Sequence, residues 1–142
     1  MKPNDPPRFT PSRPGEIDAA RRAPAPQAFL EGARLFNAGA YFACHEALEP
    51  LWLAEKGPVR DCYKGVIQIA GGLFHLERRN RNGALIMLPR GVCYVSRFLP
   101  SCHGADLVSF AARSIEALAF LVNAPKEAFL PRELIPRIEF LS

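Results

Sequence analysis

The stretch YFACHEALEPLW, from Tyr41 to Trp52, holds residue types that can bind a metal ion or move a proton. On a helix, offsets of three, four and seven residues return to the same side, so His45, Glu49 and Trp52 share one face. Tyr41 lies one turn earlier on that stripe, and Glu46 directly follows the histidine. The spacing therefore predicts an imidazole and a carboxylate side by side on one helix.

The next helical stretch has a polar face of matching composition, made of Gly65, Gln68, Gly72 and His75. A short connection near residue 57 predicts that the two helices form an antiparallel hairpin, in which residues equidistant from the turn are neighbours. A pairing centred there puts Gln68 level with His45 and Glu49. His75 lies about a turn and a half further along. It would reach His45 only with a favourable stagger between the helices.

These residues suggest a metal site in which His45, Glu49 and His75 are ligands and Glu46 is the general base. Two imidazoles and a carboxylate with an open position suit catalytic zinc or iron. The string from His45 to Glu49 is also similar to the HExxH pattern, in which helical spacing brings two ligands together and the adjacent glutamate handles a proton. Here the second helical ligand is a glutamate, and the third must come from another helix.

Two alternatives remain open. In the first, the same residues form a polar core: His45 donates to Glu49, His75 pairs with a backbone carbonyl or with Gln68, and Trp52 fills volume. In the second, they line a metal-free pocket for a small ligand. Buried His and Glu side chains cost several kcal/mol of desolvation unless they are paired, which argues against a chance arrangement but does not separate these interpretations.

The elements that must position these residues are helices, because apolar residues recur at helical spacing and nothing alternates with period two over a strand's length. We expect an all-α fold, an irregular bundle of about five helices behind an extended arm. A proline-rich arm, disordered or extended, is expected over residues 1–25 and a single helical domain over 26–142. The expected helices cover residues 26–37, 40–54, 58–79, 83–99 and 107–122.

Particular residues refine that layout. Pro50 and Pro89 lie inside expected helices and should bend them, although Pro50 could instead mark a helix boundary. Asp106 is in position to cap the last helix. The apolar tail beyond Pro125 is expected to dock on the bundle.

Bulk composition limits the classes of function. The net charge is +4 and half of it lies in the first 25 residues, so the body lacks the basic patch of a nucleic-acid binder. No apolar run is long enough to span a bilayer, and we expect a cytoplasmic protein with no membrane contact. The four cysteines have no CxxC spacing and are expected to be reduced and mostly buried.

The strings FNAGAYFACHEALEPLW and YKGVIQIAGGLFHLERRNRNGALIML resemble the bacterial and archaeal DUF309 family over roughly residues 29–100. The first family motif is matched by Asn37, Gly39, Tyr41, His45, Glu46, Glu49 and Trp52. The second is matched by Gly65, Ile67, Gln68, His75, Asn80, Gly83 and Ala84. Pro50 and Arg79 depart from the pattern. The resemblance implies a compact helical domain labelled a predicted metal-dependent hydrolase, with no established substrate.

The sequence therefore leads to two functional hypotheses. In the first, the chain is a metal-assisted hydrolase of a small molecule, with a pocket lined by Tyr41, Trp52 and Gln68 around the ligands. In the second, it is a non-catalytic helical module whose His/Glu network fixes helix pairing. The arm and the tail would then serve a partner or a homodimer.

Overall fold

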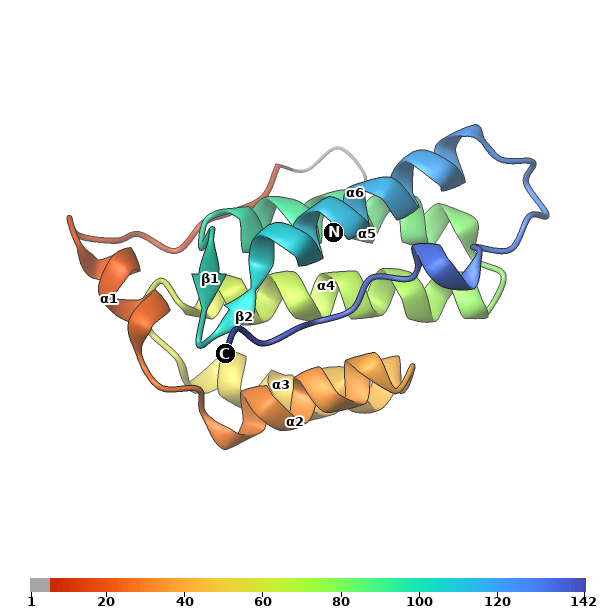
Figure 1. Ribbon diagram of the computed structural model, residues 1–142. Helices are drawn as coiled ribbons and strands as arrows, with labels where there is room; N and C mark the ends of the chain where they lie inside the picture. Colours follow the sequence, from red (N-terminus) through yellow and green to blue (C-terminus); the bar gives the residue numbers. More distant parts are fainter. Residues whose placement is uncertain (1–5) are drawn as a thin grey trace.

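The computed structural model describes residues 6–142, and the fold is all-α, as predicted (Figure 1). The described elements, in chain order, are α1 (Glu16–Arg22), α2 (Gln27–Asn37), α3 (Tyr41–Ala54), α4 (Arg60–Glu77), α5 (Arg81–Ser96), β1 (Ser101–Cys102), β2 (Ala105–Asp106), α6 (Leu107–Asn123) and the 3-10 turn η1 (Arg132–Leu134). Helices α2 to α6 correspond to the five that the apolar spacing predicts. No helix within residues 6–142 is both long and apolar enough to cross a membrane.

Helix α4 runs through the middle of the bundle, with α2 and α3 on one side and α5 and α6 on the other (Figure 1). The core residues come from all of these helices. Phe36 of α2 packs edge-on against Phe110 of α6, with 5.3 Å between ring centroids. The buried face of α3 consists of Tyr41, Cys44 and Leu48. The stripe that carries His45 therefore lies next to the buried face of α3 and not on it.

Two glycines allow α4 and α5 to cross at very short range. A Cβ atom on Gly65 would lie 2.5 Å from Cγ1 of Val95 and 3.0 Å from the carbonyl oxygen of Gly91. A Cβ on Gly91 would lie 2.5 Å from Cγ1 of Ile69 and 2.8 Å from the carbonyl oxygen of Gly65. Since two backbones meet here, no side-chain rotation can make room. Glycine is required at both positions for this crossing.

Local signals in the sequence account for the ends and interruptions of several helices. Asp106 caps α6 by accepting from the backbone N–H of Ser109 at 3.0 Å, as predicted. Pro50 lies inside α3, which continues to Ala54, so this proline does not mark a helix boundary. Pro89 likewise lies inside α5.

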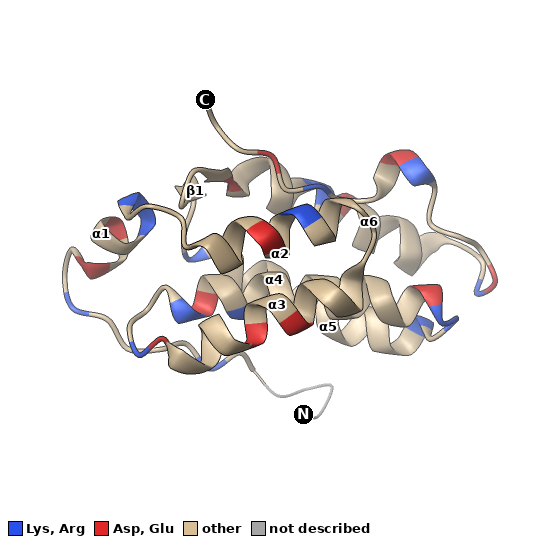
Figure 2. Ribbon diagram, turned by 90° about the horizontal axis from the view of Figure 1, so that it is seen from below, with Lys and Arg blue, Asp and Glu red and all other residues tan. Residues whose placement is uncertain are grey.

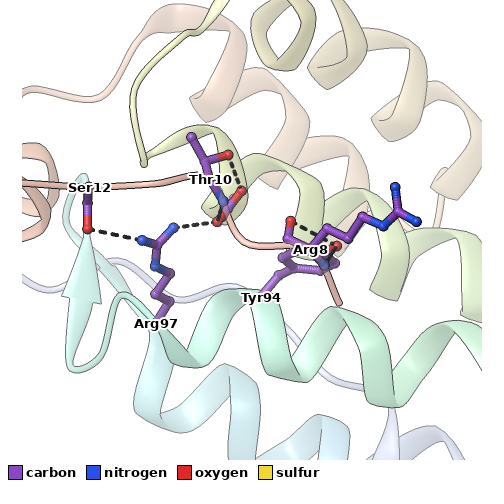
Figure 3. Close-up of polar contacts among 6 residues, drawn as sticks. Arg8, Thr10, Ser12, Tyr94 and Arg97 are labelled. Atoms are coloured by element: carbon purple, nitrogen blue, oxygen red, sulfur yellow. Dashed lines mark hydrogen bonds and ion pairs between the residues drawn. The ribbon is translucent and has the colours of Figure 1, made fainter. Parts of the chain in front are cut away.

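The described part of the N-terminal arm lies against α4 and α5 (Figure 3). Thr10 donates from its backbone N–H and its hydroxyl to the buried carboxylate of Asp61, both at 2.8 Å. Arg97, the residue that follows α5, donates to the same carboxylate at 2.5 Å and to the hydroxyl of Ser12 at 3.1 Å. Residues 16–22 of the arm form α1, and the expectation for residues 1–5 falls outside the described part of the chain.

The C-terminal tail returns to the bundle at two places. Ile138 is buried, and its backbone exchanges two hydrogen bonds of 2.8 Å with the side-chain amide of Asn37. Leu141 donates from its backbone N–H to the carbonyl of Gly104 at 2.7 Å, beside the hairpin of β1 and β2. Phe129, by contrast, is 74% exposed. The tail therefore docks through Ile138, and its first part covers the bundle more loosely.

Candidate functional site

The central pair of the candidate site lies on the surface of α3. The Nε2 atom of His45 is 3.0 Å from Oε2 of Glu49, the contact that their spacing of four residues predicts. Their side chains are 43% and 46% exposed, so the pair is half in water. A ligand in solution can reach it without opening the core. The adjacent Glu46 is exposed. In Figure 2, α2 and α3 lie in front and acidic positions appear on both helices.

Trp52 lies one turn after Glu49, beneath two cations from the start of α4. The guanidinium carbon of Arg60 is 4.5 Å from the centroid of the indole, and Nζ of Lys64 is 5.7 Å from it. Lys64 also lies 5.0 Å from the ring centroid of Tyr94 on α5. This end of the α3 surface is therefore positively charged, whereas the end at Glu49 is negative.

Two contacts determine how α3 and α4 are aligned. Trp52 lies against Lys64 near the turn, and Phe42 packs against Phe74 at the far end, with 5.7 Å between ring centroids. In an antiparallel pair, each step forward along α3 is a step back along α4. The two contacts therefore place Gln68 opposite Leu48, within one turn of His45 and Glu49. The sequence predicts a pairing of α3 and α4 centred on residue 57, and the observed pairing is shifted from it by two residues. The shift arises because the connection between the helices is longer than a tight turn.

Two polar atoms near the pair are buried and have no hydrogen-bond partner among the described residues. They are the indole Nε1 of Trp52 and the amide Oε1 of Gln68. Leaving such an atom unpaired costs about 1–3 kcal/mol. Native proteins usually pair these atoms with water, an ion or a ligand. A further polar group that reached these two atoms between α3 and α4 would therefore stabilise the protein.

His75 lies in the last turn of α4, next to the connection to α5. Asn80 accepts the backbone N–H of Gly83 with its side-chain oxygen at 3.0 Å, so its amide nitrogen is the atom that faces His75. That nitrogen donates to Nδ1 of His75 at 3.1 Å. The histidine thus accepts a hydrogen bond at Nδ1, which in the neutral ring leaves the proton on Nε2.

A chain of ring contacts through Phe42 and Phe74 connects the two histidines that the sequence pairs in a metal site. Ring centroids are separated by 6.3 Å from His45 to Phe42, by 5.7 Å from Phe42 to Phe74 and by 6.3 Å from Phe74 to His75. No three His, Cys, Asp or Glu side chains within residues 6–142 are grouped so that they could hold a metal ion. The structure brings His45 and Glu49 together and leaves His75 apart.

Tyr41 is on the same helix as His45 but faces the core. It is buried, and its ring packs edge-on against Phe36 with centroids 5.3 Å apart. Burial, with a smaller contribution from the negative charge of Glu77, raises the pKa of Tyr41 to about 12. Its side chain lines a cavity formed with α4 and the C-terminal tail. Tyr41 therefore lines this hollow, whereas His45 lies on the outer surface of α3.

His103, in the turn between β1 and β2, is buried and fully hydrogen-bonded. Its Nδ1 lies 2.8 Å from the carbonyl oxygen of Ala23, which can only accept, so Nδ1 carries a proton. Nε2 lies 2.9 Å from the hydroxyl of Tyr63, whose ring stacks on the imidazole. No local signal indicates this, because both partners are distant in sequence. His103 joins the arm to α4 and has no spare nitrogen for catalysis while its ring is neutral.

The cysteines are free thiols, and Cys93 alone among them is exposed. Burial raises the pKa of Cys44 to about 12. A hydrogen bond with Cys102, together with burial, raises the pKa of Cys62 well above its ordinary value. Thiols held in their neutral form are poor nucleophiles. Three of the four cysteines are buried, as predicted, and these thiols are unsuited to nucleophilic catalysis.

Comparison with protein families finds one relevant match. Residues 29–87 match the family model described as "Domain of unknown function (DUF309)". This segment contains α2, α3 and α4 with the start of α5, and hence His45, Glu49, Gln68 and His75. No curated protein matches the chain.

Proposed function

Since the chain belongs to the DUF309 family, whose description names no activity, we propose from its residues that it hydrolyses a small polar molecule bound on the surface shared by α3 and α4. The observation that carries the proposal is the half-exposed pair of His45 and Glu49 beside two buried, unpaired polar atoms. If His45 and Glu49 served only to stabilise the fold, no unpaired polar atoms would be needed near them. A substrate with a donor and an acceptor that displaced the side chains covering those atoms would satisfy them and approach the imidazole.

The chemistry we propose is general base catalysis. The Nε2–H of His45 donates to Glu49, which orients the ring and stabilises its protonated form. Nδ1 then takes a proton from a water molecule as that water attacks the substrate. The imidazolium returns this proton to the leaving group as its bond to the substrate breaks. The cations near Trp52 supply positive charge for an anionic part of the substrate or for charge that develops during the attack.

A metal-assisted form of the reaction is a variant of this proposal. His45 and Glu49 suit zinc or iron as two ligands of a set, and Glu46 is the adjacent carboxylate that could serve as base. His75 is the third ligand of the proposed set, and the rings of Phe42 and Phe74 form a chain of contacts from His45 to His75.

The test is hydrolysis of a panel of small chromogenic esters, amides and phosphate esters by the untagged protein. His45→Ala should lower kcat/KM by about 100-fold or more, the usual contribution of a general base. Glu49→Gln should lower it less, and His75→Gln should leave it unchanged. Equal activity of the wild type and His45→Ala on every substrate turned over would refute the proposal, as would the absence of turnover across the panel.

Metal content separates the two forms of the reaction. In the metal-assisted form, protein purified without an affinity tag would hold stoichiometric metal that both His45→Ala and His75→Ala lose. In the metal-free form, activity would persist after treatment with a chelator. Elemental analysis and the chelator assay on the same preparations give the answer.

A second candidate, a non-catalytic interaction module, is favoured by two exposed apolar side chains on α3. Phe42 is 55% exposed and Leu53 is 52% exposed, at opposite ends of the helix. A homodimer or a partner protein that covered α3 would bury both. Sedimentation of the wild type beside Phe42→Ser and Leu53→Ser tests self-association. A dimer that both substitutions dissociate would support this function, and a monomer at high concentration would argue against the homodimer.

A further inference from the structure

The tail and the end of α4 enclose a second hollow, away from the surface of His45. Its volume is about 130 Å³, and it lies between Tyr41 at the start of α3, Leu73 and Leu76 on α4, and Leu130 and Ile135 on the tail. Figure 1 shows the tail, in dark blue, passing beside the end of α4 where that helix turns into α5. An apolar cavity of roughly 150 Å³ is large enough to take a benzene molecule. This hollow is of that order.

One charged group lines the hollow, the carboxylate of Glu77 at the last residue of α4. No Lys, Arg or His nitrogen of the described residues lies within 4.0 Å of it. Glu77 is exposed at the rim, and its negative charge is a minor cause of the raised pKa of Tyr41, which lines the same hollow. The lining is therefore apolar apart from one negative charge that no ion pair within residues 6–142 neutralises.

The arginines that follow Glu77 in the sequence contact other groups. Arg78 lies over the ring of Phe74 at 5.5 Å, and Arg81 donates to the carbonyl oxygen of Leu121 on α6. Arg79 lies 4.5 Å from the ring centroid of Phe129, which also lines the hollow, so this cation stands at the rim of the hollow. None of the three forms an ion pair with the carboxylate of Glu77. A cationic group on a ligand would be its complement.

The segment that covers the hollow is held to the bundle by side chains. Its backbone hydrogen bonds are internal turns, from Ala128 to Pro125, from Leu134 to Pro131 and from Ile135 to Arg132. The next connection to another element is the pair of hydrogen bonds between Ile138 and Asn37. Because so few backbone bonds tie it down, this segment can lift at low cost and admit a ligand.

From this geometry we propose that the hollow between α3, α4 and the tail binds a small organic amine, with the apolar body among the leucines and the ammonium at Glu77. The site is independent of the function proposed for His45. A single ring with a short aminomethyl or aminoethyl arm has the required size, and the phenol of Tyr41 offers the ammonium an acceptor.

The test is calorimetric titration of the full chain with benzylamine and with benzyl alcohol, which has nearly the same shape without the charge. Glu77→Gln keeps the shape of the wall and should weaken benzylamine binding by about tenfold, the usual scale for a charge-assisted hydrogen bond. Binding of benzyl alcohol should be weaker than that of benzylamine and unaffected by Glu77→Gln. Glu116→Gln, an exposed change on α6, is the matched control and should alter neither.

A second variant tests the cavity itself. Leu130→Trp adds bulk from the half-buried tail and should abolish binding of both probes while leaving the thermal unfolding temperature near that of the wild type. The proposal is overturned if benzylamine does not bind the wild type, if Glu77→Gln binds it as tightly as the wild type, or if a folded Leu130→Trp variant still binds it.

Discussion

The substitution Arg97→Met tests the buried carboxylate that ties the arm to the bundle. Asp61 is 1% exposed and accepts three hydrogen bonds, two from Thr10 at 2.8 Å and one from Arg97 at 2.5 Å. Removing the arginine leaves a buried charge with only neutral donors, which typically costs 3–5 kcal/mol of the free energy of unfolding, and we expect about 3 kcal/mol because Arg97 is partly exposed. Thr10→Val removes one hydrogen bond to a charged acceptor and should cost about 1.5–3 kcal/mol.

Urea unfolding followed by circular dichroism measures both losses. Because both donors bind one carboxylate, the double variant should deviate from additivity by about 0.5–3 kcal/mol. Arg13→Met is the control, since Arg13 is an exposed arm residue, and it should change stability by less than about 0.5 kcal/mol. If Thr10→Val proved as stable as the wild type, the arm would not be docked on Asp61. If Arg97→Met cost less than about 1 kcal/mol, the carboxylate would not be a buried, paired charge.

Three further predictions concern the core, the thiols and alkaline pH. Gly91→Ala should lower the free energy of unfolding by about 1–3 kcal/mol or more, because the new methyl group would meet the backbone of Gly65; an unchanged melting temperature would contradict the close crossing. A thiol reagent should modify one cysteine, Cys93, in the native protein and four in denaturant, and rapid modification of a second native thiol would show that a buried one is accessible. The pKa of Tyr41 is raised above its unfolded value, so its contribution to stability is complete below about pH 10 and is lost as the pH rises toward 12. Tyr41→Phe should reduce that loss in alkaline unfolding curves, and an identical pH dependence would show that Tyr41 ionises freely.

The sequence by itself determined the features that depend on neighbours within a few residues. Apolar residues at helical spacing predict α2 to α6, because a helix repeats every 3.6 residues whatever surrounds it. The same local geometry puts His45 within 3.0 Å of Glu49 and lets Asp106 cap α6. The family assignment also rests on such short motifs.

Tertiary structure decided every relation between residues on different helices. Whether His75 meets His45 depends on how far α4 is rotated and shifted against α3, and the packing of Phe42 on Phe74 is one of the contacts that fix this alignment. The burial of His103 arises in the same way, from a partner 40 residues away in the sequence. Such contacts depend on the balance of packing over the whole core, which no local pattern encodes. For that reason the sequence could name the residues of a candidate site, but only the packed bundle decided which of them meet.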